Sequence, residues 1–279
     1  MKQTDTESLI KLPYFDYLLH LLATNNAAVA KSFGRHVHWG YWAAPKTASL
    51  SDDDFAKAAE QLTAQVCASV PVDNNLHVLD VGCGFGGTVA FLNETYTGMQ
   101  LVGVNIDARQ LERARACVVA APTNTVDFQQ GNACALPFAD NSFDVVLAVE
   151  CIFHFPSRAL FFQEAFRVLK PNGYLALSDF LPSSALLPFS KMNWFGRFYG
   201  QCHLDYRYKD YRQLATTTGF NALVERDITA NTLPTYDYLN ILAKQQGISH
   251  QTARLETAVV AILSRLHLLD YVIFSWQKV

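Results

Sequence analysis

The sequence predicts an α/β fold with a seven-stranded, mostly parallel sheet and helices on both of its faces. From residue 76 onward, short apolar runs alternate with amphipathic stretches such as ARQLERARACVVA. Apolar runs that are bounded by turn residues and separated by helical patterns are typical of a parallel sheet covered on both sides. A glycine-rich turn in VLDVGCGFGG (78–87) follows the first run, where such sheets place their ligand crevice.

Each strand of this sheet is expected in one of the apolar runs. In chain order the strands are predicted near 76–81, 100–105, 125–130, 143–149 and 173–179, then in NALVERDI and DYVIFSWQKV. A helix is expected near 209–218, and a single helical segment at about 250–266 is expected between the last two strands. This arrangement suits a sheet that ends in a hairpin-like pair of strands.

Two regions lie outside the alternation. Residues 1–70 have helical patterns, interrupted by FGRHVHWGYWAAP, and are expected to form a separate N-terminal helical part. Residues 71–279 then form the α/β domain. Residues 180–208 follow the fifth strand, carry many aromatic residues without a clear period, and are expected to form a cap inserted into that domain.

The overall charge favours a small-molecule partner. The chain has 22 basic and 25 acidic residues, a formal net charge of −3, and no Lys/Arg cluster typical of nucleic-acid binding. Acids stand in MKQTDTES where a secretory signal has an apolar stretch, and Asp16 and His20 interrupt YFDYLLHLLA. We therefore expect a soluble, cytoplasmic protein with no stable membrane insertion.

The cysteines and histidines do not predict a metal site. The six cysteines are scattered singly, without a C-x-x-C pair, and are expected to be reduced thiols. His36 and His38 form a possible metal-binding pair, but no nearby Asp, Glu or His completes a coordination shell in the sequence.

The glycine turn has a spacing that distinguishes between cofactors. Gly82, Gly84 and Gly86 allow a sharp turn and a close approach of a ligand to the main chain. The pattern D-x-G-x-G-x-G-G, led by Asp80, differs from the dinucleotide fingerprint G-x-G-x-x-G. It closely resembles the first motif of class I S-adenosylmethionine (SAM)-dependent methyltransferases, and SAM carries a cationic amine and a sulfonium that suit a nearby acid.

The resemblance extends over about two hundred residues, in the order found in that family. GVNIDARQL has Asn105 where many members have an acid that binds the ribose. This resembles the small-molecule subgroup related to cyclopropane-fatty-acid synthases and to sterol, quinone and sarcosine methyltransferases, in which a neutral residue and a later glutamine share that role. Asp107 is the alternative ribose ligand. GNACALPFADNSFDVV and ECIFHFPSRALFFQEAFRVLKPNGYLALSDF resemble the following segments, with Asn132 in place of the usual adenine-binding aspartate.

The resemblance implies a Rossmann-like fold, SAM as cofactor and S-adenosylhomocysteine as product. HVHWGYW is similar to the N-terminal lid of the subgroup, so 1–70 is expected to be a lid, with Trp39 and Trp42 closing over the adenosyl group. Core packing against the first helix is the alternative for these aromatics. The cofactor contacts implied are His38, Tyr41, Asp80, Gly82, Cys83, Gly84, Asn105, Ile106, Gln110, Asn132, Ala133 and Glu150.

Three residues are expected to assist the chemistry. Methyl transfer is an in-line displacement in which positioning supplies much of the rate, but a hydroxyl acceptor must also lose its proton. His154, in ECIFHF, matches a histidine proposed as general base in related enzymes; alternatively it only shapes the pocket. Asp179 matches an acid that contacts the acceptor or orients the histidine, and a cap is its alternative role. Glu150 is expected to face the amino-acid part of the cofactor or to complete a hydrogen bond in the pocket wall.

The cap is expected to select the acceptor. Aromatic side chains with a few polar tips suit a mostly hydrophobic ligand, whereas lid packing or a homodimer contact is the alternative. The residues expected to bind substrate are Trp194, Phe195, Phe198, Tyr199, His203 and Tyr206, with Met192 beside them.

The sequence thus predicts a methyltransferase of a small, largely apolar or aromatic acceptor, at oxygen, with His154 as base. Carbon or nitrogen methylation of a prenyl, quinone or amine natural product is the first alternative. A SAM-binding cyclase or partner protein that transfers no methyl group is the second. A nicotinamide oxidoreductase is disfavoured by the glycine spacing.

Overall fold

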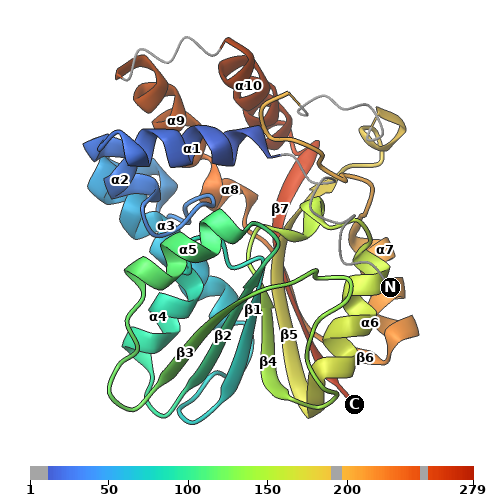
Figure 1. Ribbon diagram of the computed structural model, residues 1–279. Coiled ribbons are helices and arrows are strands. Elements are labelled where there is room, and N and C mark those ends of the chain that lie inside the picture. The colour runs from blue at the N-terminus through green and yellow to red at the C-terminus, as the bar shows by residue number, and fades with distance from the viewer. Residues whose placement is uncertain (1–11, 190–196, 246–250) are drawn as a thin grey trace, which may run out of the picture.

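The protein is built around one twisted sheet with helices on both faces (Figure 1). The computed structural model describes residues 12–189, 197–245 and 251–279. The strands are β1 His77–Val81, β2 Gln100–Asn105, β3 Thr125–Gln130, β4 Phe143–Ala148, β5 Leu169–Pro182, β6 Phe220–Asp227 and β7 Leu269–Lys278. Their order in the seven-stranded sheet is β3-β2-β1-β4-β5-β7-β6, and only β7 runs antiparallel to its neighbours β5 and β6. The predicted fold class is confirmed.

Most helices of the described residues precede β6 in the chain: α1 Pro13–Ala23, α2 Ala27–Phe33, α3 Asp52–Cys67, α4 Gly87–Thr95, α5 Ala108–Cys117, α6 Arg158–Val168 and α7 Tyr208–Thr218. The others lie between β6 and β7: α8 Thr229–Thr232, α9 Pro234–Gln245 and α10 Gln251–Arg265. Short 3₁₀ turns occur at η1 Pro45–Thr47, η2 Ile152–His154 and η3 Leu187–Phe189.

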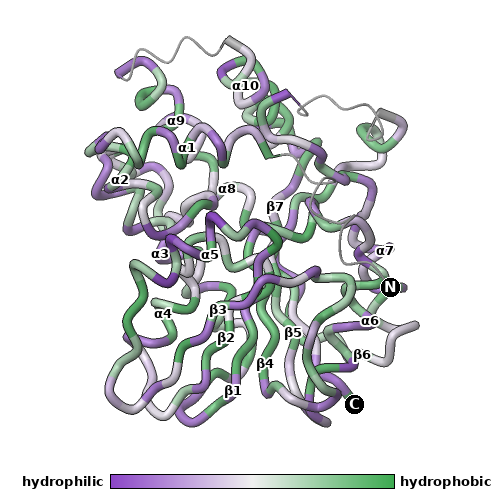
Figure 2. Tube along the Cα trace, viewed as in Figure 1, coloured by the Kyte–Doolittle hydropathy of each residue, from purple (hydrophilic) through white to green (hydrophobic). Residues whose placement is uncertain are grey.

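Both faces of the sheet are buried, which explains why the strands are continuous apolar runs rather than alternating ones. Successive residues of β1 point to opposite faces: Val78 belongs to the core under α3, α4 and α5, whereas Leu79 belongs to the core under α6 and α7. The central strand β4 is coloured as hydrophobic along most of its length (Figure 2). Its Val146 and Leu147 are fully buried on the two opposite faces.

The segment between β6 and β7 differs from the prediction. One helical segment was expected there, but the structure has α8, α9 and α10. Helix α8 has only four residues, too few to show a period. Helix α9 begins at Pro234, and a proline at the first helical position is well tolerated although it looks like a breaker in the sequence.

A helical layer lies over the carboxyl ends of the strands. Figure 1 shows α1, α2, α9 and α10 above the sheet, although α1 and α10 are separated by more than two hundred residues. Phe33, Phe55 and Tyr238 join α2, α3 and α9 in a small core of their own. In the part of the chain that the structure describes, no helix combines the length and apolarity needed to cross a membrane.

Candidate active site

Two cavities lie side by side at the carboxyl edge of the sheet. The larger has a volume of about 720 Å³, and apolar side chains from α1, α2, α9, α10 and the segment 198–204 form most of its wall. The smaller has a volume of about 90 Å³ and adjoins the glycine turn after β1. Five residues line both cavities, so a ligand in one would meet a ligand in the other there: Tyr14, Val37, His38, Glu150 and His154.

The glycine turn forms the floor of the smaller cavity. Gly82 has φ of +79°, and a Cβ atom added there would lie 2.7 Å from the side chain of Cys151. Gly84 also has a positive φ, of +54°, but a Cβ there would meet only Gln110, 4.0 Å away. Gly82 therefore allows close packing of the chain, whereas Gly84 leaves open space against the main chain. Gly82, Cys83 and Gly84 all line this cavity, as predicted for cofactor residues.

Asp80 presents a buried carboxylate to the smaller cavity. Asp80 is only 2% exposed, and its Oδ2 has no hydrogen-bond partner among the described residues. Burial raises the pKa of this carboxyl to about 7. A cationic group beside it would stabilise the charged form and provide the missing partner. The residue thus fits the amine of the SAM amino-acid part.

An amide pair lies at the end of β2. Asn105 Nδ2 donates to Gln110 Oε1 at 3.0 Å; both residues are buried, and together with Ile106 they line the smaller cavity. Asp107, the alternative ribose ligand, does not line it. Its Oδ1 instead accepts from the backbone and side chain of Arg109, at 2.9 and 3.0 Å, where it caps α5. The geometry therefore favours Asn105 and Gln110 over Asp107.

Three predicted cofactor contacts, and one aromatic residue expected to close over the adenosyl group, do not line the smaller cavity. Asn132 and Ala133 do not line the smaller cavity, and Asn132 Oδ1 accepts from Cys134 N at 2.9 Å. Tyr41 lines neither cavity. Trp42 Nε1 donates to Asp54 Oδ2 at 3.0 Å within the small core of α2 and α3, so it does not close over the crevice.

Helix α1 occupies part of the crevice. Leu12, Tyr14 and Phe15 line the smaller cavity, and the ring of Phe15 packs edge-on against Phe85 with a centroid distance of 6.0 Å. The remaining 90 Å³ is well below the ~300–1,000 Å³ of ordinary small-molecule sites. A ligand of the size of SAM therefore requires the α1 side chains to move outward.

Two buried histidines lie next to each other beside the crevice. His36 Nε2 donates to Glu60 Oε2 at 2.6 Å, and His36 Nδ1 lies 3.1 Å from His38 Nε2. His38 Nδ1 donates to Trp39 O at 2.9 Å. Because Glu60 and His38 use different nitrogens of His36, the three side chains do not converge on one point as metal ligands would. Burial and the neighbouring His36 lower the pKa of His38 to about 3, so His38 is neutral.

Glu150 sits at a strained turn after β4, with φ of +50°. Its backbone N donates to Ser178 Oγ at 3.0 Å, and its carboxyl Oε2 accepts from Trp39 N at 2.9 Å and from the hydroxyl of Tyr271. Burial raises the pKa of Glu150 to about 8. At neutral pH it is therefore largely a protonated carboxyl group, between the two cavities.

His154 faces the shared wall in a defined tautomer. A carbonyl can only accept, so the 2.9 Å contact with Gln201 O places the proton on His154 Nδ1. Nε2 is then an acceptor, and the hydroxyl of Tyr14 donates to it at 3.3 Å. Burial lowers the pKa of His154 to about 4. The ring is therefore neutral near pH 7, and the electron pair of Nε2 can take a proton once the Tyr14 hydroxyl moves away from it.

Asp179 is not brought to either cavity. It is fully buried, and Oδ2 accepts from Arg158 Nη2 at 2.9 Å and from the hydroxyl of Tyr211. Its Oδ1 accepts from Phe180 N at 2.8 Å. Both oxygens of the carboxylate are therefore hydrogen-bonded to groups in the core. Neither oxygen contacts His154 or lines a cavity.

Only part of the predicted acceptor site lines the larger cavity. Phe198 and Tyr199 do, whereas His203 and Tyr206 do not. Tyr206 instead lies under the guanidinium of Arg158, 4.9 Å from its ring centroid. Met192, Trp194 and Phe195 lie outside the described residues.

The sequence analysis missed most of the larger cavity, because α9 and α10 supply much of its wall. It also missed Tyr14 and Tyr271, which contact the two candidate catalytic groups. The aromatic stretch PYFDYLLHLLA was a usable signal for Tyr14. Tyr271 stands in an apolar strand and carried no signal.

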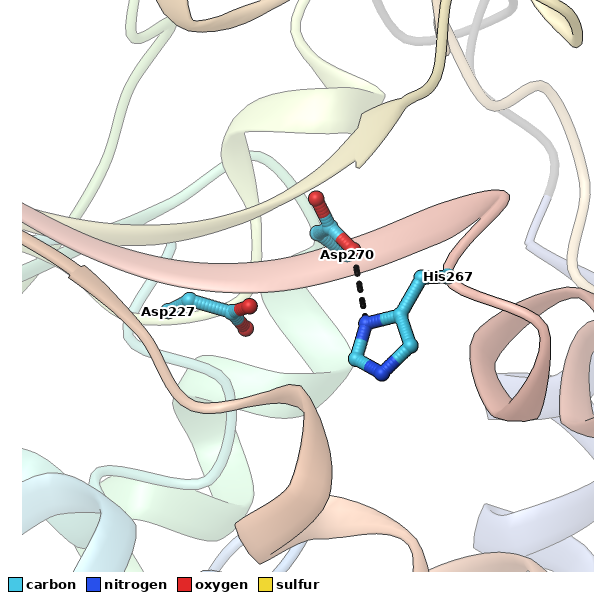
Figure 3. Close-up of side chains that lie close together, drawn as sticks. All are labelled: Asp227, His267 and Asp270. Atoms are coloured by element: carbon cyan, nitrogen blue, oxygen red, sulfur yellow. Dashed lines mark ion pairs between the residues drawn. The ribbon is translucent and has the colours of Figure 1, made fainter.

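One group of possible metal ligands lies away from both cavities. His267 Nδ1 is 3.6 Å from Asp270 Oδ1, and the carboxylate of Asp227 points toward the same space at the β6–β7 edge (Figure 3). None of the three lines either cavity. Asp227 and His267 are exposed, and exposed groups of this kind give no evidence of a role in the reaction.

The fold and the site define a class of protein. The glycine turn, the unpaired carboxylate of Asp80 and the amide pair after β2 surround a crevice for a cationic nucleoside in a Rossmann-like α/β enzyme. A second, apolar cavity adjoins this crevice, and His154, a possible base, lies on the wall that the two share. This arrangement is expected for the transfer of a small group between two bound molecules.

Comparison with known proteins gives the family. A family model described as a methyltransferase domain matches residues 79–177. Methyltransferase GfsG from Streptomyces halstedii is 38% identical over 58% of this chain, which spans just over half (56%) of that relative. O-methyltransferase resE from Aspergillus sclerotiorum is 32% identical over 73% of this chain and 75% of its own. (+)-O-methylkolavelool synthase from Herpetosiphon aurantiacus is 33% identical over 71% of this chain and 68% of its own.

The chain belongs to the class I SAM-dependent methyltransferases, as its motifs predicted. Among solved structures, mycolic acid cyclopropane synthase CmaA1 has a TM-score of 0.77, 16% identity and coverage of 96% of this chain and 99% of its own. The [4+2]-cyclase SpnF has a TM-score of 0.73, 22% identity and coverage of 96% and 98%. At these identities the likeness concerns the fold alone.

Proposed function

We propose that this enzyme methylates a hydroxyl oxygen of a bulky, largely apolar small molecule, with SAM in the smaller cavity and the acceptor in the larger one. The observation that carries the proposal is the position of His154, whose Nε2 electron pair faces the wall shared by the two cavities. A neutral imidazole at this place can take the proton of an acceptor hydroxyl.

The cofactor residues fit the charge pattern of SAM. Asp80 offers an unpaired carboxylate for the amine, and the turn at Gly82–Gly84 offers bare main chain for the amino-acid part. Asn105 and Gln110 are buried hydrogen-bonding groups suited to the ribose. When bound, SAM supplies a methyl group that is activated by its positively charged sulfur.

The acceptor class follows from the larger cavity. A volume of about 720 Å³ lies in the upper part of the usual range for small-molecule sites, ~300–1,000 Å³. Aromatic and aliphatic side chains dominate its wall, including Phe153, Phe180 and Tyr236. The names of two relatives, an O-methyltransferase and an O-methylkolavelool synthase, support oxygen as the acceptor atom.

The step performed by the chain is proton removal during transfer. His154 Nε2 would receive the hydroxyl proton as the acceptor oxygen bonds to the methyl carbon, while the methyl–sulfur bond breaks and its electron pair stays on the sulfur of S-adenosylhomocysteine. The Gln201 carbonyl would stabilise the resulting imidazolium through Nδ1–H. The hydroxyl of Tyr14 must leave Nε2 for the acceptor to reach it. The apolar wall of the larger cavity keeps water away from the acceptor, and binding in two adjoining cavities holds the two molecules close together.

The test combines binding with product analysis. Calorimetry should show SAM binding, and incubation with methyl-labelled SAM and a panel of hydroxylated terpenoids and macrolides should give an O-methylated product with release of S-adenosylhomocysteine. Failure of SAM to bind would refute the proposal. Tight SAM binding with label recovered on carbon would refute the oxygen assignment only.

A second candidate is favoured by Glu150. Carbon methylation of an alkene needs a base for the later proton loss, and cation-stabilising aromatic rings. Glu150 lines the larger cavity together with Phe153 and Phe180, and once ionised, with a pKa of about 8, it is the stronger base of the two candidates. Carbon-labelled product from a prenyl acceptor, lost in Glu150→Gln but kept in His154→Gln, would establish this alternative.

A further inference from the structure

Helix α10 holds a buried carboxylate against the main chain of a neighbouring segment. Glu256 is only 4% exposed. Its Oε1 accepts from Arg197 N at 3.2 Å, and its Oε2 accepts from Phe198 N at 3.1 Å and from Tyr199 N at 3.4 Å. Three successive backbone N–H groups thus stabilise one buried carboxylate, and that carboxylate fixes the position of residues 197–199.

A neighbouring bond fixes the same segment to the same helix. The hydroxyls of Tyr199 and Thr257 are 2.7 Å apart. Glu256 and Thr257 are consecutive residues of α10, so the attachment involves one turn of helix. Tyr199 also lines the larger cavity, which places this attachment at the acceptor site.

The held segment continues directly to His154. Two residues after Tyr199, the carbonyl of Gln201 accepts from His154 Nδ1 at 2.9 Å. Two residues later, His203 N donates to Phe153 O at 2.8 Å. The segment 197–203 is therefore attached at one end to α10 and at the other to the turn that carries the base.

The segment also fixes the other neighbour of His154. Phe198 O accepts from Tyr14 N at 3.0 Å, and Tyr14 provides the hydroxyl that lies 3.3 Å from His154 Nε2. The segment 197–201 therefore influences both nitrogens of the His154 ring. Its Gln201 carbonyl contacts Nδ1, and its Phe198 carbonyl holds the main chain of Tyr14, whose hydroxyl contacts Nε2. The three N–H groups at the start of that stretch are all directed at Glu256.

We propose that Glu256 is a positioning residue for the methyl-transfer base. Its carboxylate holds residues 197–199 in place, so that the Gln201 carbonyl keeps the proton on His154 Nδ1 and Nε2 remains the hydrogen-bond acceptor of the ring. The inference rests on the proposed function only in taking His154 as the base; the positioning itself is a property of the protein without ligands.

The proposal predicts a measurable state of the His154 ring. In the intact protein the ring is partly buried and its Nδ1 donates to Gln201 O, so one tautomer dominates and the pKa lies low, at about 4. Loosening of the segment admits water to the ring and lets both nitrogens carry the proton, which raises the pKa toward its ordinary ~6.5. The titratable or charged groups around the ring are Tyr14 from α1, Glu150 and Cys151 from its own turn, Arg158 from α6, and Cys202 and His203 from the segment.

The experiment reads the ring directly. Protein labelled with ¹⁵N-histidine, without SAM or acceptor, is titrated from pH 4 to 8, and long-range ¹H–¹⁵N spectra report the tautomer and pKa of each ring; His154→Asn identifies the His154 signals. Glu256→Gln keeps the size of the side chain but sets an amide NH₂ against three N–H donors. We expect a mixture of tautomers and a midpoint raised by about one to two pH units. Glu225→Gln, which removes an exposed carboxylate paired with Arg212, is the matched control and should leave His154 unchanged.

Folding of each variant is checked by circular dichroism and by SAM calorimetry. A folded Glu256→Gln protein in which His154 keeps both its tautomer and its midpoint overturns the proposal. Thr257→Val removes the neighbouring bond without disturbing a buried charge, and should shift the midpoint in the same direction by a smaller amount. If Glu256→Gln does not fold, an unchanged His154 in Thr257→Val overturns the proposal instead. Loss of activity in His154→Gln tests the base separately, so the two ideas can fail independently.

Discussion

The two cavities of this enzyme differ in how the chain builds them. The smaller one lies on the ends of β1 and β2 and the turns that follow them, so that its floor comes from residues close together in sequence. The larger one is lined by helices from both parts of the chain, α1 and α2 before the sheet and α9 and α10 near its end. If SAM and the acceptor occupy these cavities as proposed, substitutions can alter the acceptor cavity without altering the cofactor cavity, because different segments form most of each.

The two cavities also differ in their electrostatics. The smaller presents a buried carboxyl group at Asp80, whose Oδ2 has no hydrogen-bond partner and whose charged form a cationic ligand would stabilise. The larger is mostly apolar, and the ionisable groups of the shared wall are held neutral there by burial: His154 is unprotonated and Glu150 is largely protonated at pH 7. This contrast predicts that substitutions in each region will have separate effects on cofactor binding and on acceptor turnover.

Removal of the base on the shared wall should give the largest effect. We expect His154→Gln to lower kcat by about 10²–10⁴-fold, the usual contribution of a positioned general base. SAM affinity should change less than about threefold, because the groups expected to hold the amino-acid part and the ribose are untouched. Single-turnover assays and calorimetry separate the two quantities. An unchanged kcat would mean that positioning alone supplies the catalysis.

Removal of the Asp80 carboxylate in the smaller cavity should give the second-largest effect. Asp80→Asn keeps the shape of the side chain but removes the charge opposite the SAM amine, and we expect SAM affinity to fall about 10–100-fold at pH 8. Turnover at saturating SAM should fall much less than in the His154 variant. Asp107→Asn is the control, because Asp107 lies outside the cavity and should leave SAM affinity nearly unchanged. Equal losses in both variants would contradict the assignment of Asp80.

The ligand-free protein should lose stability as pH rises. The folded-state pKa values of Asp80 and Glu150, about 7 and about 8, lie above their ordinary values, so the folded protein retains protons that the unfolded chain has released. The buried neutral rings of His38 and His154 act in the opposite direction up to about pH 6.5, where the unfolded chain releases its histidine protons. The free energy of unfolding should therefore fall between about pH 7 and pH 8, by roughly 1 kcal/mol per pH unit. Urea denaturation measures it. Asp80→Asn should flatten this slope, and SAM should oppose the loss in the wild type; a rising slope would disagree with both assignments.

Narrowing the larger cavity should give the smallest effect. Ala243 lines it from α9 and is partly exposed, so Ala243→Phe can place its ring in the cavity without overpacking the core. We expect KM for a bulky acceptor to rise about tenfold, equivalent to ~1.4 kcal/mol, with SAM affinity unchanged. Leu223→Phe on the exposed face of β6 is the control. Weaker SAM binding in Ala243→Phe would mean that the two cavities are not independent.

The sequence predicted the cofactor side far better than the acceptor side. Asp80, Gly82, Gly84, Asn105 and Gln110 were all expected at the crevice, and all line it. They lie on consecutive strand ends, where local pattern and sheet topology together fix the position of a side chain.

The acceptor side depended on packing between distant segments. His203 and Tyr206 were expected to bind the acceptor but do not line the larger cavity, whereas Tyr236, from a helix that was not predicted, does. Asp179 was expected to be a catalytic acid near a strand end, but its carboxylate accepts hydrogen bonds from Arg158 in α6 and Tyr211 in α7. No periodicity along the chain could show which partner a buried acid meets.

The amino-acid sequence by itself determined the sheet, the glycine turn and the class of enzyme, because these depend on apolar runs and spacings within a few dozen residues. Only the tertiary structure decided the ionisation and surroundings of the reactive groups. The carbonyl that sets the tautomer of His154 lies 47 residues away, and the hydroxyl that contacts Glu150 lies 121 residues away. Charge, burial and hydrogen bonding act through space, so they follow from how the segments pack rather than from their order in the chain.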